Sequence, residues 1–232
     1  MRSIIEIKLI NQALEHIDQN VDLVFFDIDN TLLAAADRAN VVSWAEGFER
    51  YIRTQYAQRH NLSLLQQDVL VAQYITEYVN TMQTQLVEQH AIDIIKTLQQ
   101  RNTHIIALTA RPHGTATVSS QQLAHCGISL SDHVLNPKTF HIPTLKYPIT
   151  FQDGIISCGN TPKGQAAVHL FNMTNIKPKS VVLIDDTAPY LEEMAQTLTQ
   201  AGIGFKGLRY SYLDEAVRQF IFSLEHLPPH LR

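Results

Sequence analysis

The apolar and polar positions of the chain follow two rhythms. Short runs rich in valine and isoleucine are apolar at nearly every position, which is typical of strands buried on both faces of a sheet. These runs lie at residues 23–28, 104–109 and 180–185, with a less continuous fourth run at 204–210. Other segments repeat their apolar residues every three or four positions, as along one face of a helix, at residues 91–102, 161–175, 189–202 and 212–227. Strands that alternate with helices predict an α/β fold, a Rossmann-like parallel sheet with helices on both faces.

Residues 34–89 do not belong to this alternation, because they contain no strand candidate. Two helical stripes of large apolar residues run through them. The first stripe consists of Trp44, Phe48, Tyr51, Ile52 and Tyr56, and the second of Leu70, Tyr74, Tyr78 and Met82. Stripes of this kind usually form a core. We therefore interpret residues 34–89 as a small helical insertion, and residues 1–33 and 90–232 as the α/β core that receives it.

The first twenty residues predict a helix. Their apolar positions recur at helical spacing, at Ile4, Ile7, Ile10, Leu14 and Ile17. Charged residues interrupt any apolar stretch long enough for a secretion signal. We expect a cytoplasmic protein, and an exported form remains an alternative.

A second irregular segment, residues 147–160, contains the pair Asp153 and Gly154. An Asp-Gly pair between two apolar runs is typical of the turn of a β-hairpin. The two cysteines, Cys126 and Cys158, lie far apart and without the spacing of a metal site. We expect them to be small core residues, and a single disulfide stays open.

Composition and charge narrow the classes of partner. The chain has 232 residues, of which 45% are hydrophobic, and its formal net charge is -4. This balance gives no electrostatic reason to expect DNA or RNA as a partner. No apolar run approaches the ~20 residues that cross a membrane. The composition suits one sizeable globular domain, or a core domain with an insertion, and it leaves the oligomeric state open.

Polar side chains gather at the ends of the predicted strands. They are Asp27 and Asp29 after the first strand, Thr109 and Arg111 at the second, and Asp185 and Asp186 at the third. Lys163 lies in the first turn of the helix at 161–175, for which Thr161 is the expected N-cap and Pro162 the first helical residue. The helix dipole disfavours a cation there, and a bound phosphate would explain it. Each residue alone is common as a turn or a cap, but the carboxyl ends of parallel strands meet at one edge. Together they predict a site.

In this order, the motifs resemble those of the haloacid-dehalogenase (HAD) superfamily of Mg-dependent aspartyl phosphatases. The stretch DIDNT at 27–31 resembles the first motif, Thr109 the second, Lys163 the third, and the Asp pair at 185–186 the fourth. The resemblance covers residues 20–33 and 90–212. The IDNTL stretch, Trp44 and the GII…KG segment are also similar to a bacterial group within that superfamily whose substrate is not assigned.

The resemblance implies a role for each residue. Asp27 would be the nucleophile that forms an aspartyl-phosphate, and Asp29 the general acid and base. Mg²⁺ would be held by the carboxylates of Asp27 and Asp185 and by the backbone carbonyl of Asp29. Asp186 would be a further ligand or would contact one of these ligands. Phosphate binding is expected from Thr109 and Lys163 and from Asn30, a residue that tolerates the left-handed backbone of a tight turn. For Arg111, a contact with a substrate phosphate or carboxylate and a structural ion pair both remain open. The insertion would be a cap that selects a small phosphorylated substrate.

Several other functions use similar residues. Receiver domains of two-component signalling have the acidic pair first and the lone aspartate later, the reverse of this chain. A dehalogenase would lack the acid at Asp29. A catalytically silent binding or interaction protein derived from such a phosphatase would be expected to have lost one of the four motifs, and none is lost. A phosphotransferase or a phosphoprotein phosphatase would use the same residues, so these alternatives stay open, as does the substrate.

Overall fold

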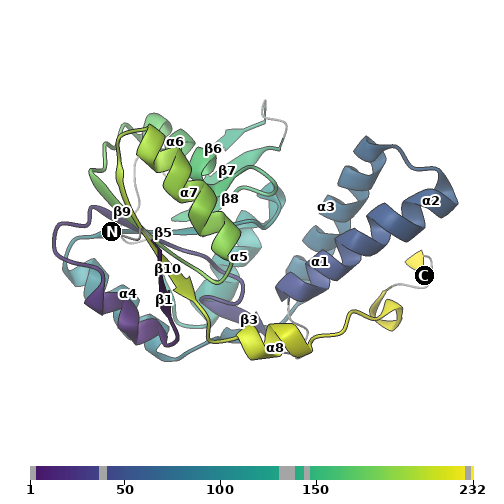
Figure 1. Ribbon diagram of the computed structural model, residues 1–232, viewed down its shortest axis with the longest axis horizontal. Helices are drawn as coiled ribbons and strands as arrows, with labels where there is room; N and C mark the ends of the chain where they lie inside the picture. Colours follow the sequence, from purple (N-terminus) through teal and green to yellow (C-terminus); the bar gives the residue numbers. More distant parts are fainter. Residues whose placement is uncertain (1–3, 37–40, 131–138, 144–146, 228–230) are drawn as a thin grey trace.

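The computed structural model describes residues 4–36, 41–130, 139–143, 147–227 and 231–232. Within them, eight strands form one sheet in the order β1-β10-β9-β2-β5-β8-β7-β6 (Figure 1). The strands are β1 (Ile4–Ile7), β2 (Leu23–Phe26), β5 (His104–Thr109), β6 (Thr139–Ile142), β7 (Ile149–Gln152), β8 (Ile155–Ser157), β9 (Ser180–Asp185) and β10 (Gly204–Tyr210). The six strands from β1 to β8 in this order pair in parallel, and β7 and β6 continue the sheet antiparallel. The expected α/β fold is confirmed.

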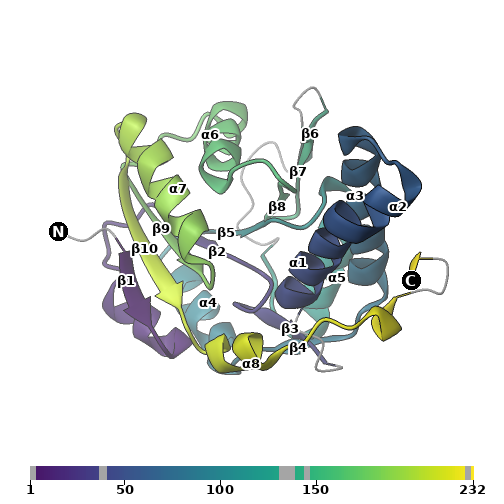
Figure 2. The ribbon, with the colours of Figure 1, turned by 45° about the vertical axis from the view of Figure 1, so that its right-hand side comes forward.

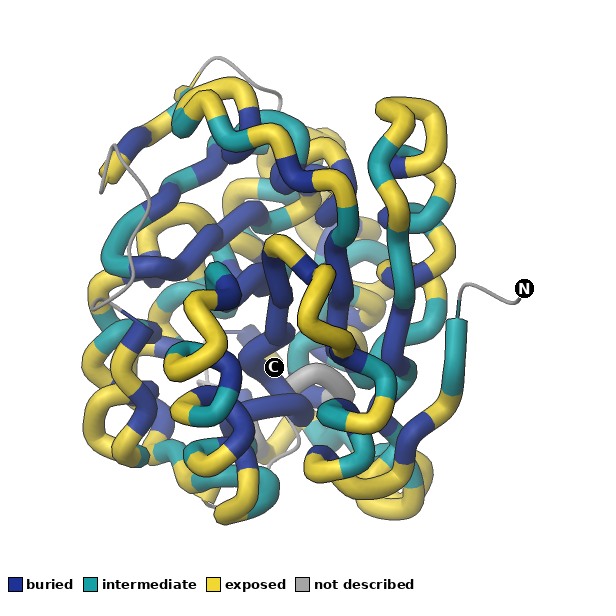
Figure 3. Tube along the Cα trace, turned by 90° about the vertical axis from the view of Figure 1, so that its left-hand side faces the viewer, coloured by how far each residue is buried: buried dark blue, intermediate teal, exposed yellow. Residues whose placement is uncertain are grey.

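Helices cover both faces of this sheet. On one face lie α4 (His90–Gln100), α5 (Ala116–His125) and the 3-10 helix η1 (Ile10–Glu15), and on the other lie α6 (Lys163–Thr174) and α7 (Ala188–Gln200). The central strand β2 shows why its sequence is continuously apolar. Val24 and Phe26 pack into the first layer, whereas Leu23 and Phe25 pack into the second, and all four are fully buried. Figure 3 shows this buried centre and the more exposed outer surfaces of the helices.

The N-terminal helix predicted from the first twenty residues is wrong. Residues Ile4–Ile7 form the edge strand β1, which pairs in parallel with β10, and only the short 3-10 helix η1 follows. β-Branched isoleucines favour a strand where a neighbouring strand offers its edge. The strand that pairs with β1 lies about two hundred residues away, so the local pattern of the first twenty residues contains no sign of it.

The predicted hairpin is confirmed, with Asp153 and Gly154 at φ 52° and 81° between β7 and β8. Strand β6 and helix α5, which follows the 3-10 turn η3 (His113–Thr115), were not predicted. Both cysteines are free thiols. Cys158 is buried in the layer under α6 and α7, and Cys126 packs at the edge of the opposite layer. They therefore behave as the small core residues expected from the sequence.

The insertion is largely helical, as expected. It contains α1 (Val41–Tyr51), a π-helical turn η2 (Ile52–Tyr56), α2 (Ala57–His60) and α3 (Leu64–Thr81), and we call these helices the cap (Figure 2). The two predicted stripes meet, with Trp44 stacked on Phe48 at 5.3 Å and on Tyr78 at 4.2 Å between ring centroids. The expectation that 34–89 holds no strand is wrong. Strands β3 (Leu33–Ala35) and β4 (Thr84–Leu86) pair antiparallel where the chain enters and leaves the cap.

The C-terminal helix predicted at 212–227 is correct only in its first part. Helix α8 (Asp214–Gln219) ends early, and an extended stretch leads to the 3-10 turn η5 (Leu224–His226). Phe220 and Phe222 lie two positions apart, and both pack against the cluster formed by Trp44, Phe48 and neighbouring apolar residues of the cap. Residues two apart share a face in an extended chain but not in a helix. The segment thus runs from the end of β10 to the cap, although the sequence assigned it to the core (Figure 1). Among the described residues, no helix is long and apolar enough to cross a membrane.

Candidate active site

Asp27 lies at the carboxyl end of the central strand β2, where the chain turns sharply. Its backbone N–H still donates to the carbonyl of Ile184 on β9, at 2.9 Å, so the neighbouring strand holds the residue in place. The turn is completed by Asn30, which has φ 60° and whose N–H donates to the carbonyl of Leu33 at 2.8 Å. The left-handed backbone expected of Asn30 is therefore present. The turn directs the side chains of Asp27, Asp29 and Asn30 to the edge where β5 and β9 also end, whereas Ile28 packs in the core.

Lys163 joins the ends of two strands. Its Nζ donates to Oδ1 of Asp27 and to Oδ2 of Asp185, both at 2.6 Å, and the side chain is only 1% exposed. Burial opposes the ammonium, but the carboxylates of Asp185 and Asp27 raise the pKa of Lys163 above its ordinary value. These two partners explain a cation at a helix start, where the dipole is unfavourable.

The N-cap residue of α6 differs by one position from the one expected from the sequence. Pro162 occupies the N-cap, Lys163 is the first helical residue, and the hydroxyl of Thr161 donates to the carbonyl of Tyr147. The prediction of Thr161 as N-cap is therefore wrong, because its side chain binds the neighbouring loop. Lys163 still lies in the first turn, as expected.

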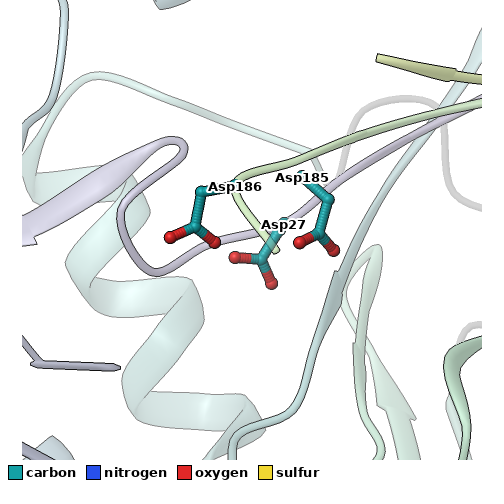
Figure 4. Close-up of side chains that lie close together, drawn as sticks. All are labelled: Asp27, Asp185 and Asp186. Atoms are coloured by element: carbon teal, nitrogen blue, oxygen red, sulfur yellow. The ribbon is translucent and has the colours of Figure 1, made fainter. Parts of the chain in front are cut away.

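Three carboxylates converge beside this lysine (Figure 4). Asp27, Asp185 and Asp186 each offer an oxygen atom within 4.8 Å of the others. Burial, together with Asp185, Asp186 and Asp29, raises the pKa of Asp27, although Lys163 acts in the opposite direction. Burial and Asp185 raise the pKa of Asp186 to about 7, while Asn30 and Thr187 donate to it at 3.1 and 3.2 Å. Carboxylates whose ionised form is this unfavourable suit a bound cation.

The chemistry of this donor set fits a hard divalent cation. Four aspartates face two cations at this edge, so full ionisation leaves two negative charges. The converging atoms are all carboxylate oxygens, which Mg²⁺ and Ca²⁺ prefer, and the described residues add no histidine or cysteine to the cluster. Asp27, Asp185 and Asp186 could therefore hold such an ion.

Arg111 forms the ion pair that is one of the two roles left open by the sequence. Its Nε and Nη2 donate to the two carboxylate oxygens of Asp29 at 2.8 and 2.7 Å, and the guanidinium is almost fully buried. Its Nη1 donates to Ser119 at 2.8 Å and to Gln122 at 2.7 Å, both on α5. Arg111 thus forms a structural ion pair with Asp29, one of the strongest side-chain pairings.

The ion pair continues into the cap. The side-chain amide of Gln122 donates to the carbonyl of Val79 at 2.8 Å and to that of Met82 at 3.4 Å, at the end of α3. A chain of buried hydrogen bonds therefore connects Asp29 through Arg111 and Gln122 to the point where the cap joins the core.

A cavity of about 150 Å³ lies between this edge and the cap. From the core, Asp27, Asp29, Thr109, Arg111 and Asp186 line it; from the cap, Glu46, Glu49, Ile75 and Val79. The hydroxyl of Thr109 accepts from the backbone N–H of Arg111 at 3.1 Å. Lys163, Asp185 and Asn30 lie beneath the lining and are almost fully buried. All the site residues predicted from the sequence thus meet at one place.

A family model described as a protein of unknown function, DUF2608, matches residues 3–227. The chain belongs to the DUF2608 family. An uncharacterised protein of Rickettsia prowazekii is 22% identical to this DUF2608 chain over an alignment of 210 residues, and the match covers 87% of this chain and 73% of that protein.

Solved structures also resemble the DUF2608 chain. A phosphonoacetaldehyde hydrolase-like protein from Oleispira antarctica has a TM-score of 0.50 and 14% identity, covering 77% of this chain and 70% of that one. A haloacid dehalogenase-like family hydrolase from Xanthomonas campestris has a TM-score of 0.45 and 14% identity, covering 87% and 95%. At such identities a likeness concerns the fold alone.

Three residues around the site of the DUF2608 chain were missed from the sequence. Ser119 and Gln122 lie on the buried face of α5, the same face as the apolar Leu123. Buried polar residues need hydrogen-bond partners, so a polar residue on an otherwise apolar helix face is a signal that can be found in a sequence. Tyr190 on α7 places its ring centroid 4.7 Å from Nζ of Lys163. Nothing in the local sequence distinguishes this tyrosine from an ordinary helix residue.

Proposed function

We propose that this protein is a Mg²⁺-dependent phosphatase that hydrolyses small phosphomonoesters through a phosphorylated Asp27. One observation carries the proposal. The Asp27 carboxylate lines a cavity at the end of a parallel strand, with Lys163 and two further carboxylates gathered around it. Phosphoryl transfer needs a nucleophile and positive charge, which Lys163 and a cation held by these carboxylates would supply together.

The divalent ion belongs to the proposal on the strength of its donor set. Asp27, Asp185 and Asp186 would hold it, together with the backbone carbonyl of Asp29 that the family resemblance suggests. When bound, Mg²⁺ supplies positive charge that offsets both the clustered carboxylates and the oxygens of the phosphoryl group.

The proposed first step takes place at the carboxylate of Asp27. One of its oxygens attacks phosphorus, the new O–P bond forms, and the bond from phosphorus to the alcohol oxygen breaks. Asp29 gives the departing alcohol its proton. In the second step Asp29 removes a proton from water, the water oxygen attacks phosphorus, and the O–P bond to Asp27 breaks to release inorganic phosphate.

Thr109 and Arg111 have supporting parts in this scheme. The hydroxyl of Thr109 lines the cavity and can donate to a phosphoryl oxygen while it accepts from the N–H of Arg111. Arg111 is a positioning residue, because its two hydrogen bonds fix the carboxylate of Asp29 beside the cavity. These bonds occupy two of the roughly four lone-pair sites of the carboxylate, so another site can carry the proton.

The first experiment measures hydrolysis of an aryl phosphate and of small alkyl phosphates by the purified protein with Mg²⁺. Asp27→Asn should reduce hydrolysis to background and abolish any phosphoenzyme in intact-protein mass spectrometry. Asp153→Asn is the matched control, because Asp153 occupies a left-handed hairpin position that asparagine also tolerates. EDTA should remove the activity and Mg²⁺ should restore it. Normal activity of Asp27→Asn, or full activity in EDTA, would contradict the proposal.

A catalytically silent phosphate-binding protein is the second candidate, since Asp29 is held by Arg111 with both oxygens. The two candidates differ in the fate of Asp29→Asn. An enzyme that loses its general base should accumulate a phosphoryl adduct on Asp27 with an aryl phosphate, because that leaving group needs little protonation. A silent protein should form no adduct in either the wild type or the variant.

A further inference from the structure

A second cavity, of about 290 Å³, adjoins the one at Asp27. The two cavities share four lining residues, Glu49 and Ile75 from the cap and Ala110 and Asn160 from the core. A molecule attached to the phosphoryl group can therefore extend from the first cavity into the second.

The second cavity is lined mainly by apolar side chains. One wall is a face of α3, on which Leu65, Val69, Ala72 and Ile75 follow one another at helical spacing, and the opposite wall includes Pro112 and Pro148. Leu65 and Val69 are 73% and 59% exposed although both are large and apolar. Exposed apolar side chains that line a cavity beside a reactive group are typical of a ligand site.

The charges around this cavity disfavour an anionic occupant. Among the described residues that line it, none is lysine or arginine. Its two acidic residues, Glu49 and Asp68, are both paired with Arg53, at 2.7 and 2.8 Å. Burial and the neighbouring His141 lower the pKa of His113, which favours its neutral form. A second phosphate or a carboxylate would find no cationic partner on these walls.

We propose that this second cavity binds the leaving group, and that the substrate is the phosphate monoester of an uncharged, apolar alcohol or phenol. The assignment rests on the proposed function, because it names the leaving group of that reaction. A cavity of about 150 Å³ lined by apolar residues holds benzene. The second cavity has about twice this volume, enough for a substituted ring or an alkyl chain.

Two alkyl phosphates test the assignment without a difference in leaving-group chemistry. Hexyl phosphate and glycerol 3-phosphate both release a primary alcohol, but only the hexyl chain gains from apolar burial. Burial of several CH₂ groups should raise kcat/KM for hexyl phosphate at least about tenfold above that for glycerol 3-phosphate. Equal values, or a preference for glycerol 3-phosphate or a sugar phosphate, would overturn the assignment.

A filling variant links the preference to the cavity. In Ala72→Trp, the indole ring should fill part of the second cavity beside α3. The ratio of kcat/KM for hexyl phosphate to that for glycerol 3-phosphate should then fall by about tenfold, because the hexyl chain loses the volume into which it binds. Gln73→Trp is the matched control, since Gln73 is the next residue of α3 and lines a different surface depression. A ratio that falls equally in both variants, or in neither, would count against the cavity.

Binding of phosphonates separates this assignment from the proposed function, because phosphonates are not hydrolysed. Calorimetry should find hexylphosphonate bound more tightly than methylphosphonate, with the advantage lost in Ala72→Trp. If these results hold while no phosphomonoester is hydrolysed, the cavity is supported and the phosphatase fails. If hydrolysis proceeds while the two phosphonates bind equally, the phosphatase is supported and the cavity assignment fails.

Discussion

Lys163 and Arg111 are two buried cations at the same edge of the sheet, and they are used differently. Lys163 bridges carboxylates at the carboxyl ends of β2 and β9, so these hydrogen bonds remain within the core. Arg111 donates hydrogen bonds to the carboxylate of Asp29 and to Gln122 on α5, and Gln122 donates in turn to a carbonyl at the end of α3 in the cap. Lys163 therefore supports the assembly of the carboxylate cluster, whereas Arg111 couples the proposed acid to the position of the cap. Each can be removed separately to test this division.

The largest effect is expected from Lys163→Met. The change leaves the carboxylates of Asp27 and Asp185 buried without their cation, and breaking a buried ion pair typically costs about 3–5 kcal/mol. The free energy of unfolding measured with urea should fall by about that amount. Lys177→Met, at an exposed lysine, is the control. Wild-type stability of Lys163→Met would refute the bridging role.

Arg111→Lys should mainly affect catalysis. Lysine keeps the charge but lacks the planar guanidinium that pairs in parallel with both oxygens of Asp29, so the carboxylate loses its fixed orientation. We expect kcat with an alkyl phosphate to fall about 10²-fold, the lower range of general acid–base contributions. Stabilisation by Mg²⁺ should not change, because Arg111 contacts none of the three converging carboxylates. If Mg²⁺ stabilises the variant much less than the wild type, Arg111 also supports the carboxylate cluster, and its role is not distinct from that of Lys163.

The carboxylate cluster should make both stability and metal binding depend on pH. The pKa of Asp186 is raised from 3.8 to about 7, so in the metal-free protein the folded state keeps a proton that the unfolded chain has lost. The free energy of unfolding should therefore decrease as the pH rises between these two values. Mg²⁺ needs the ionised carboxylate, so its stabilising effect should be small at about pH 5.5 and full at about pH 8. Thermal unfolding with and without Mg²⁺ measures both trends, and a pH-independent Mg²⁺ effect would contradict them.

The smallest effect separates two hydrogen bonds of Arg111. Gln122→Ala and Ser119→Ala each remove one acceptor from Nη1 of Arg111, and each should cost about 1–3 kcal/mol because a buried donor loses a partner. Only Gln122 also binds the end of α3. Hydrogen exchange of peptides that span residues 79–86 should accelerate in Gln122→Ala and not in Ser119→Ala. Equal acceleration in both would show that the coupling to the cap does not pass through Gln122.

The sequence predicted the centre of the fold and the residues of the candidate site for one physical reason. Strands buried on both faces are continuously apolar, and polar residues directly after them stand out, as Asp27 and Asp185 do. Predictions failed where the deciding partner is remote in sequence. The edge strand β1 depends on β10, and the extended stretch after α8 depends on contacts with the cap.

The same limit applied to Arg111. Its position after β5 places it at the strand ends, but its pairing with Asp29 depends on how α5 faces the turn after β2. The interrupted apolar face of α5 could point to Gln122, but its contact with the end of α3 could not have been assigned from the sequence, since it joins segments about forty residues apart. Local periodicity contains no information about such pairs.

The segment that runs from α8 to the cap has a consequence for the order in which the protein folds. Tyr51 in α1 donates through its hydroxyl to the carbonyl of Leu231, 180 residues further along the chain. Phe222 lies so close to Gly47 that a β-carbon there would come within 2.6 Å of its side chain. During synthesis the cap helices emerge early, but these partners are made about 180 residues later, long after the cap sequence itself. The cap can therefore reach its final packing only after the segment up to Leu231 has been made, and its aromatic cluster stays incomplete until then.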